Sequence, residues 1–268
     1  MTADDVPRVI GVIHLPPLPG TPFHDPSTFD AGLETVRASV EALVMGGASA
    51  ALLQTADRVY DLSAGTDPLR VAVLTRLLVK VREATPSWFE LGIQVMRNEV
   101  EESLAIALAT GCSFVRATAL IGTTLSPSGW VTANAAAIMR YRDRIGAWDI
   151  KLLADIASVH YSSDDDDLAQ LAGRAMTAGA DAVVVGLPDI SRTLAILGSL
   201  RRIRADVPVV LAGHATFDNA GDLFPWVDSA FVSTALSRGG FYGQFDASLV
   251  RRMVELARRA RPAQDQRT

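Results

Sequence analysis

Three histidines and one aspartate in the sequence are suited to proton-transfer chemistry. His14, Asp155 and His214 each come at or shortly after the end of a short apolar run, and His160 lies five residues beyond Asp155. Imidazole and carboxylate groups exchange protons near neutral pH, and they also bind divalent metal ions. A divalent metal is therefore one alternative, although no two of these histidines have the helical spacing of a zinc protease motif. The other alternative is that each side chain only caps a loop. The sequence assigns no further cofactor.

Two arginines, Arg97 and Arg116, follow two further apolar runs. A guanidinium group binds a carboxylate or phosphate through two parallel hydrogen bonds, so this pair is suited to anion binding. The alternative is an ion pair with Glu99 or Asp155 that only braces the fold, because structural ion pairs occupy the same kind of position.

The elements that must position these residues alternate regularly along the 268 residues. The predicted strands are Val9–Ile13, Ala50–Leu53, Leu91–Val95, Ser113–Ala117, Ile150–Ala154, Ala182–Val185, Val207–Leu211 and Ser229–Val232. The predicted helices are Phe29–Met45, Pro68–Ala84, Val100–Thr110, Thr132–Ile145, Leu168–Thr177, Ser191–Arg204, Asp218–Phe224 and Ala247–Arg259. Eight strand–helix units in roughly 250 residues are typical of a (β/α)8 barrel. We expect a single α/β domain over residues 1–268, a closed TIM barrel, with a frayed tail at 261–268.

An open doubly wound sheet is the competing architecture. It would show a glycine-rich nucleotide motif after the first strand. The first predicted strand instead leads into residues 14–20, His-Leu-Pro-Pro-Leu-Pro-Gly, whose prolines remove amide donors and stiffen the loop. Glycines that follow predicted helices, such as Gly47 and Gly111, are suited to the left-handed turn that leads back into a parallel strand.

In a barrel of this kind the chemistry lies at the carboxyl ends of the strands, around one opening. The predicted catalytic residues are Asp155 and His160, as a proton-transfer pair, and His14, as a second acid/base group. The substrate-binding residues predicted at the same strand ends are Arg97, Asn98, Arg116, Gln54, Gly186, Gly213, His214, Ser233 and Thr234. His24 lies further out along the first loop and is expected outside this set.

The lysines exclude one class of reaction. The chain has two, and the topology places Lys151 at the start of the fifth strand and Lys80 on the outer face of a helix. Imine chemistry needs a lysine in the site. A Schiff-base aldolase or a pyridoxal phosphate enzyme is therefore not expected.

Composition narrows the remaining classes. The formal net charge is −5, which argues against a nucleic-acid partner, and the only cysteine, Cys112, excludes an intramolecular disulfide framework. The first residues lack the basic region of a signal peptide, and no apolar run approaches the roughly 20 residues that span a bilayer. We expect a cytoplasmic protein with a small-molecule substrate and no integral membrane association. A homo-oligomer remains an alternative to a monomer.

The opening string, residues 11–20, resembles the amino-terminal signature of the BtpA family. Further elements in the family's order are Arg97-Asn98-Glu99, Phe114-Val115-Arg116, Tyr141-Arg142, Ala154-Asp155-Ile156 with His160, and Thr216 with Asn219. The resemblance runs from about residue 8 to residue 260. It implies a barrel of the ribulose-phosphate-binding type. The family's namesake is a photosystem I biogenesis factor peripheral to the thylakoid membrane, and relatives occur in organisms without photosynthesis, some beside sugar-metabolism genes.

Several positions depart from the family pattern. They are Gln54-Thr55 in place of Glu-Asn, Pro127-Ser128-Gly129 in place of Asp-Gln-Gly, Val159 in place of lysine, Ala212-Gly213-His214 in place of Gly-Ser-Gly, and Ser233-Thr234 in place of Gly-Thr. The last two lie in the loops that form a phosphate cup in such barrels, where glycine lets the amides approach closely. Because bulkier residues replace glycines at these positions, the sequence predicts neither the presence nor the absence of phosphate binding at the cup.

These observations predict a divergent BtpA-family enzyme that performs acid/base chemistry. As an isomerase, lyase or hydrolase, it would act on a small polar metabolite such as a sugar phosphate, a nucleoside or a carboxylate. The alternative is a non-catalytic assembly or scaffold protein that has kept the barrel and lost the chemistry.

Overall fold

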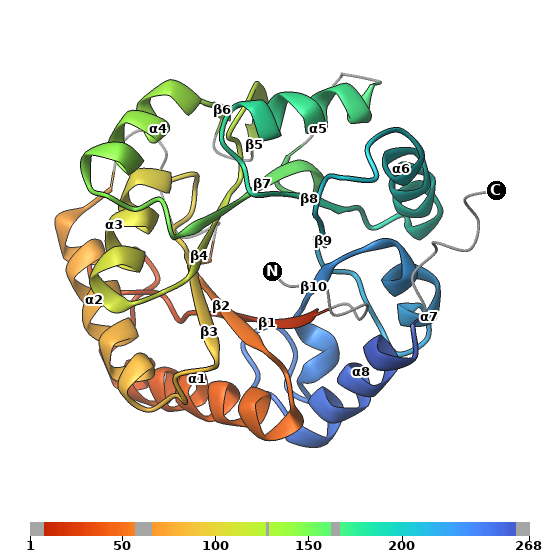
Figure 1. Cartoon of the computed structure of the whole chain (residues 1–268). Helices are drawn as coiled ribbons and strands as arrows, with labels where there is room; N and C mark the ends of the chain where they lie inside the picture. Colours follow the sequence, from red (N-terminus) through yellow and green to blue (C-terminus); the bar gives the residue numbers. More distant parts are fainter. Residues whose placement is uncertain (1–7, 57–65, 127–128, 162–166, 261–268) are drawn as a thin grey trace.

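Eight parallel strands form a closed barrel in the computed structural model, which describes residues 8–56, 66–126, 129–161 and 167–260 (Figure 1). The order around the barrel is β1-β10-β9-β8-β7-β4-β3-β2. The strands are β1 (Arg8–His14), β2 (Ala50–Gln54), β3 (Glu90–Gln94), β4 (Phe114–Ala117), β7 (Lys151–Ser158), β8 (Ala182–Gly186), β9 (Val209–Leu211) and β10 (Ser229–Val232). The predicted TIM barrel is confirmed. The predicted frayed tail, 261–268, lies outside the described residues.

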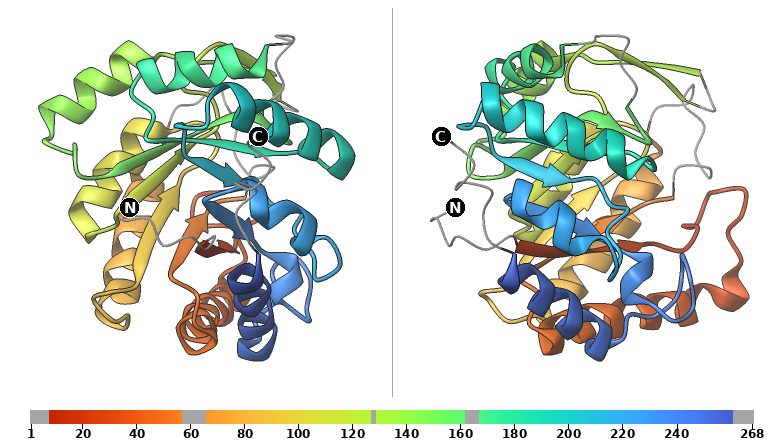
Figure 2. Two further views of the ribbon diagram at one scale, coloured as in Figure 1. Left: turned by 45° about the vertical axis from the view of Figure 1, so that its right-hand side comes forward. Right: turned by 90° about the vertical axis from the view of Figure 1, so that its right-hand side faces the viewer.

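The helices form a layer outside the strands (Figures 1 and 2). They are α1 (Pro26–Gly46), α2 (Pro68–Glu83), α3 (Val100–Thr110), α4 (Ala135–Arg144), α5 (Leu168–Thr177), α6 (Ile190–Ile203), α7 (Ala220–Leu223) and α8 (Ala247–Arg259). Aspartate side chains cap the amino-terminal ends of several helices. At α1, for example, Asp25 accepts a hydrogen bond from the Ser27 amide. Gly47 and Gly111 follow α1 and α3 in the left-handed conformation, as the turn prediction requires.

One hairpin interrupts the predicted strand–helix repeat. Strands β5 (Thr123–Ser126) and β6 (Gly129–Thr132) pair antiparallel between β4 and α4. The helix predicted to begin at Thr132 therefore begins at Ala135, where Asn134 caps it by accepting a hydrogen bond from the Ala137 amide. Because β4 runs toward the carboxyl end of the barrel, the hairpin lies at the end where the candidate site is expected.

Two apolar layers hold the barrel together. A large cluster fills the space between the strands and the helices. A smaller cluster fills the barrel interior, and its members are Ile10, Val12, Ala50, Leu52, Phe114, Leu153, Ala182, Val184, Val210 and Phe231. Successive side chains of a strand point to opposite faces. On each strand that contributes to the interior cluster, one member lies nearest the carboxyl end. The residue two positions after it therefore also points into the barrel, at the carboxyl end.

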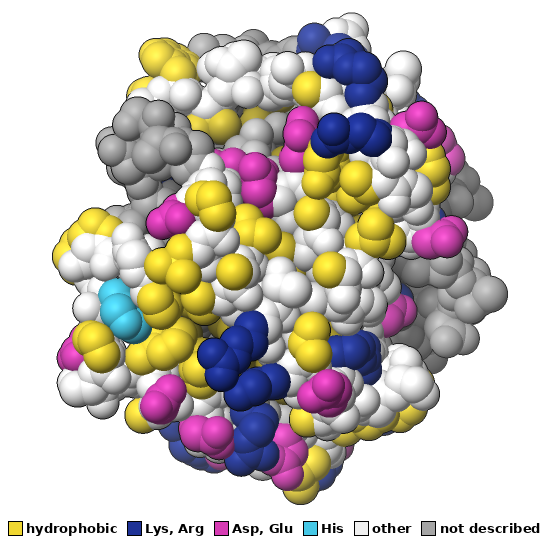
Figure 3. All heavy atoms as spheres, turned by 90° about the vertical axis from the view of Figure 1, so that its left-hand side faces the viewer, with side chains coloured by type: hydrophobic (Ala, Val, Ile, Leu, Met, Phe, Trp, Pro, Cys, Tyr) yellow, Lys and Arg dark blue, Asp and Glu magenta, His cyan; other side chains and the backbone are white. Residues whose placement is uncertain are grey.

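One outer face of the molecule is mixed in charge. Figure 3 shows the face over α2, α3 and α4, where basic side chains lie close to acidic ones, a pattern typical of a solvated surface. Among the described residues, no helix has the length and apolar character needed to cross a membrane.

Candidate functional site

A polar layer closes the interior of the barrel at its carboxyl end. Counting two residues beyond the interior apolar cluster along each strand gives His14, Gln54, Gln94, Arg116, Asp155, Gly186, Ala212 and Ser233. For β3 the inward face is fixed by Gly92, where an added Cβ would lie 2.2 Å from the Phe114 ring. Six of these eight positions belong to the predicted site. Gln94 was not predicted, although the same alternation from Gly92 would have found it.

Asp155 is fully buried in this layer, with its side chain 0% exposed. Its two oxygens accept hydrogen bonds from Nε and Nη2 of Arg116, both at 2.8 Å. The hydroxyl of Ser158 donates a third hydrogen bond at 2.5 Å. The carboxylate is thus fully engaged by protein groups, an arrangement that matches the alternative in which Asp155 is the structural partner of Arg116.

A bulge in β7 makes this arrangement possible. The register against β8 shifts between Asp155 and Ala157, and a bulge changes which side chains share a face. Asp155 and Ser158, three residues apart, therefore both point inward and hydrogen-bond to one another. Ser158 was not among the predicted residues, because the bulge has no signal in the sequence.

His160 is connected to Asp155 through Ser158. The Ser158 hydroxyl accepts hydrogen bonds from the backbone amides of His160 at 3.0 Å and Tyr161 at 3.1 Å. Burial lowers the pKa of His160 from 6.5 to about 4, helped by the positive charge of Arg116, while the charge of Asp155 acts in the opposite direction. The imidazole is consequently neutral at physiological pH and able to accept a proton.

His14 lies across the opening, at the end of β1. Its ring stacks on Phe241 with the centroids 3.7 Å apart, and its Nδ1 lies 3.3 Å from the Ser233 hydroxyl. Burial lowers the pKa of His14 from 6.5 to about 4, with further contributions from the charges of His160 and Arg116. The structure therefore brings His14, His160 and Arg116 within electrostatic range of one another. Phe241 was missed by the sequence interpretation, although the glycine-rich segment around it marks a loop.

The loop after β3 contributes Arg97 and Asn98. Arg97 is 5% exposed, and its charge lowers the pKa of His160, which places the guanidinium near the opening. Asn98 adopts the left-handed conformation with φ 63°. Its side chain accepts a hydrogen bond from the amide of Ala119 at 2.8 Å and donates one to the Ala119 carbonyl at 3.0 Å. Asn98 thus holds the loop in place. Glu99 was considered above as a partner of Arg97. Its Oε1 instead lies 3.8 Å from Nη2 of Arg70.

The substrate-binding residues predicted at the ends of β8 and β9 differ in their structural role. Gly186 is buried, and an added Cβ would lie 2.9 Å from the backbone nitrogen of Ala212, so this glycine allows β8 and β9 to pack. Gly213 and His214 both have positive φ angles, 98° and 62°. His214 is exposed, and its charge acts on His160, so it borders the opening.

The last two predicted substrate-binding residues, Ser233 and Thr234, lie after the end of β10. Ser233 contacts His14, as described above. Thr234 is exposed and begins the 3-10 helix η3 (Thr234–Leu236). The structure thus brings Ser233 into the polar layer and leaves Thr234 at its edge.

Two other expectations concern metal ions and lysines. The residues described here contain no group of three His, Cys, Asp or Glu side chains arranged to hold a metal ion. Lys151 begins β7 and pairs with Asp181 at 3.1 Å, and Lys80 is exposed on α2. Both lysines are therefore away from the opening, as the topology predicted.

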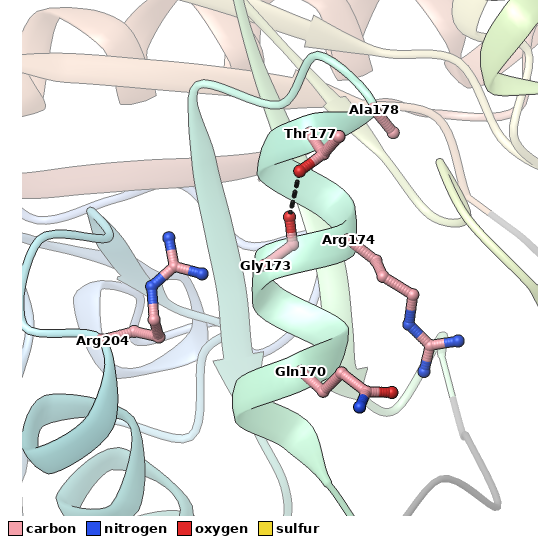
Figure 4. A pocket seen from close by; sticks show the side chains of 6 residues that line it. All are labelled: Gln170, Gly173, Arg174, Thr177, Ala178 and Arg204. Atoms are coloured by element: carbon pink, nitrogen blue, oxygen red, sulfur yellow. Dashed lines mark hydrogen bonds between the residues drawn. The ribbon is translucent and has the colours of Figure 1, made fainter.

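A separate depression lies outside the barrel. It has a volume of about 470 Å³ and is lined by Gln170, Gly173, Arg174, Thr177, Ala178 and Arg204 (Figure 4). These residues belong to α5 and to the ends of α5 and α6, on the helical layer. The depression is thus distinct from the opening that carries the histidines.

Known proteins with related sequences extend over most of the chain. An uncharacterized protein of Archaeoglobus fulgidus is 31% identical over 264 residues, which are 93% of this chain and 98% of that protein. The Photosystem I biogenesis protein BtpA of Synechocystis sp. is 26% identical over 239 residues, 87% of this chain and 81% of that protein.

Solved structures agree with the fold. Thiamine phosphate pyrophosphorylase from Pyrococcus furiosus superposes with a TM-score of 0.57 at 15% sequence identity, covering 94% of this chain and 96% of that chain. A likeness at this identity concerns the barrel architecture alone. The family model of the BtpA family matches residues 6–259. Because this match and the Archaeoglobus relative both span nearly the whole barrel, the chain belongs to the BtpA family.

Proposed function

We propose that this BtpA-family barrel is an enzyme performing acid/base chemistry on a small polar metabolite. The observation that supports the proposal best is the pair of neutral imidazoles, His14 at the end of β1 and His160 just after β7, which lie within electrostatic range of one another. Isomerisation, lyase cleavage and hydrolysis each need a base and an acid on either side of a bound substrate. A neutral imidazole beside the opening can accept a proton from one atom of the substrate and then, as imidazolium, donate it to another atom.

The roles divide as follows. His160 accepts a proton from the substrate and returns it as imidazolium, and His14 is the second group that can accept a proton and donate it again. Arg116 uses Nε and Nη2 on Asp155, which leaves Nη1 to donate to an anionic group of the substrate. Asp155 acts as a positioning residue that fixes Arg116 and, through Ser158, the backbone of His160. Arg97 contributes a second positive charge beside His160.

A non-catalytic assembly protein is the second candidate. The name of the Synechocystis relative, Photosystem I biogenesis protein BtpA, favours a role in assembly for that protein. The engagement of Asp155 by Arg116 and Ser158 also fits this candidate, because it removes the carboxylate from proton transfer. The two candidates differ in whether His14 and His160 matter for turnover of a small molecule.

A metabolite screen followed by turnover assays tests the proposal. Thermal shift with sugar phosphates, nucleosides and carboxylates identifies ligands, because a ligand that binds the folded state raises its melting temperature. Mass spectrometry then reports conversion by wild type, His14→Gln and His160→Gln. His24→Gln is the matched control, since His24 contacts the Pro17 carbonyl in the first loop. We expect a loss of roughly 100-fold or more in rate for each site variant. Full turnover by both variants, or no ligand across the panel, would favour the assembly protein.

A further inference from the structure

Two buried amide oxygens lie side by side in the polar layer. Gln54 is 3% exposed and Gln94 is 1% exposed. They are register partners on the parallel strands β2 and β3. Within the described residues, the Oε1 atoms of both side chains have no hydrogen-bond partner. Folded proteins pair nearly all buried polar atoms, so two unpaired acceptors on neighbouring strands point to a missing donor.

The orientation of Gln94 is set by a contact. Its Nε2 donates to the Thr118 hydroxyl at 3.2 Å, so its Oε1 is directed away from Thr118. Gln54 follows Leu52 of the interior cluster and points inward by the same alternation. The two oxygens therefore belong to the floor of the opening and not to the space between strands and helices.

The surroundings restrict which donor fits. Amide oxygens accept hydrogen bonds from hydroxyl, amine or ammonium groups. Arg97 and Arg116 both act against a proton on His160, while the charge of Asp155 acts in its favour, so the net positive charge around the opening disfavours a cationic ligand. The carboxylate of Asp155 is already held by Arg116. An uncharged donor remains, and a hydroxyl group provides one.

We propose that Gln54 and Gln94 form an acceptor subsite for the hydroxyl groups of a polyhydroxylated, sugar-like substrate. The inference rests on the proposed function, since it concerns the same opening. It adds the substrate class: the hydroxyl-bearing carbons lie over β2 and β3, and an anionic group lies toward Nη1 of Arg116. A simple carboxylate, which carries no donor when ionised, would leave both amide oxygens unpaired.

Binding measurements on three variants test the subsite. Ribose 5-phosphate, glucose 6-phosphate and glycerol 3-phosphate are the probes, and inorganic phosphate is the reference for the anion alone. Titration calorimetry compares wild type, Gln54→Met and Gln94→Met with the control Gln170→Met, which changes an exposed glutamine on α5. We expect at least one polyol phosphate to bind wild type more tightly than phosphate does. The subsite variants should weaken that binding about fivefold and leave phosphate binding unchanged, because one hydrogen bond to the ligand is lost.

Protein stability provides a second readout. Removing an unpaired buried acceptor should leave the melting temperature of Gln54→Met unchanged or higher without ligand. A lower melting temperature together with unchanged polyol binding would mean that the oxygens hold only ordered water, and it would overturn the subsite. Equal affinity of all probes and phosphate for wild type would overturn it as well. The proposed function fails separately, if His14→Gln and His160→Gln retain full turnover.

Discussion

Replacement of Asp155 by asparagine tests whether the buried ion pair holds the site together. The substitution keeps the shape of the side chain and removes its charge, so the Arg116 guanidinium, 4% exposed, loses its counter-charge. Removing one partner of a buried ion pair lowers the free energy of unfolding by about 3–5 kcal/mol. For a chain of this size, each 1 kcal/mol corresponds to about 2–4 °C in melting temperature. We therefore expect Asp155→Asn to melt about 6–20 °C below wild type.

A surface pair of the same geometry is the control. Asp206 also accepts from Nε and Nη2 of an arginine, Arg204, both at 3.2 Å, but its side chain is 70% exposed. Asp206→Asn should change the melting temperature little, because solvent screens exposed pairs. The double variant Arg116→Met with Asp155→Leu should recover most of the stability, since it removes both charges. Calorimetry measures all three, and an Asp155→Asn protein as stable as wild type would refute the reasoning.

Three further predictions concern the histidines and one glycine. The pKa values of His14 and His160 are lowered from 6.5 to about 4, so between these pH values the unfolded chain binds more protons than the folded one. The free energy of unfolding should therefore fall as pH drops from 6.5 to 4, by on the order of 3 kcal/mol per ring, and denaturant titrations of the His14→Gln, His160→Gln variant should show a flatter profile. Phe241→Ala uncovers the His14 ring and should raise its pKa toward 6.5, as measured by NMR titration; an unchanged value would mean that Phe241 contributes nothing to its burial. Gly186→Ala forces a Cβ against the Ala212 backbone at 2.9 Å and should destabilise the fold by about 1–3 kcal/mol in urea titrations.

The repeat of strands and helices could be predicted because each element carries its own local signal. The short apolar runs and the glycines after helices are local in sequence, and the eight barrel strands appear at or within two residues of their predicted bounds, apart from a longer β7. The β5–β6 hairpin was missed because its strands have four residues each and one exposed face. A run that short resembles a loop.

The sequence could predict the positions of those candidate site residues that lie at strand ends, but not their roles. His14, Gln54, Arg116 and Asp155 are all inward-facing residues at those ends, so topology was sufficient to place them. The role of Asp155 was not determined, because a carboxylate at a strand end looks the same whether it meets substrate or an arginine. Ser158 depends on a bulge that shifts which residues face inward.

Contacts between segments that are distant in the chain could not be predicted from the sequence either. Phe241 reaches His14 from a loop 227 positions later in the chain. Such a contact depends on closure of β1 against β10, which joins the two ends of the barrel. No local pattern reports which ring of a late loop will lie over an early strand.

The polar layer at the opening lies on apolar layers that hold the barrel closed, so residues around the opening can change without loss of the fold. The lower interior side chains keep the barrel closed, so a lineage can exchange His14 or Gln54 and acquire a new reaction on an intact scaffold. Asp155 and Arg116 are different, because they are buried against one another. Replacement of either residue alone would leave the other as a buried, unpaired charge. Within this family, new specificities should therefore arise by single replacements around the opening, while this ion pair changes only through paired substitutions.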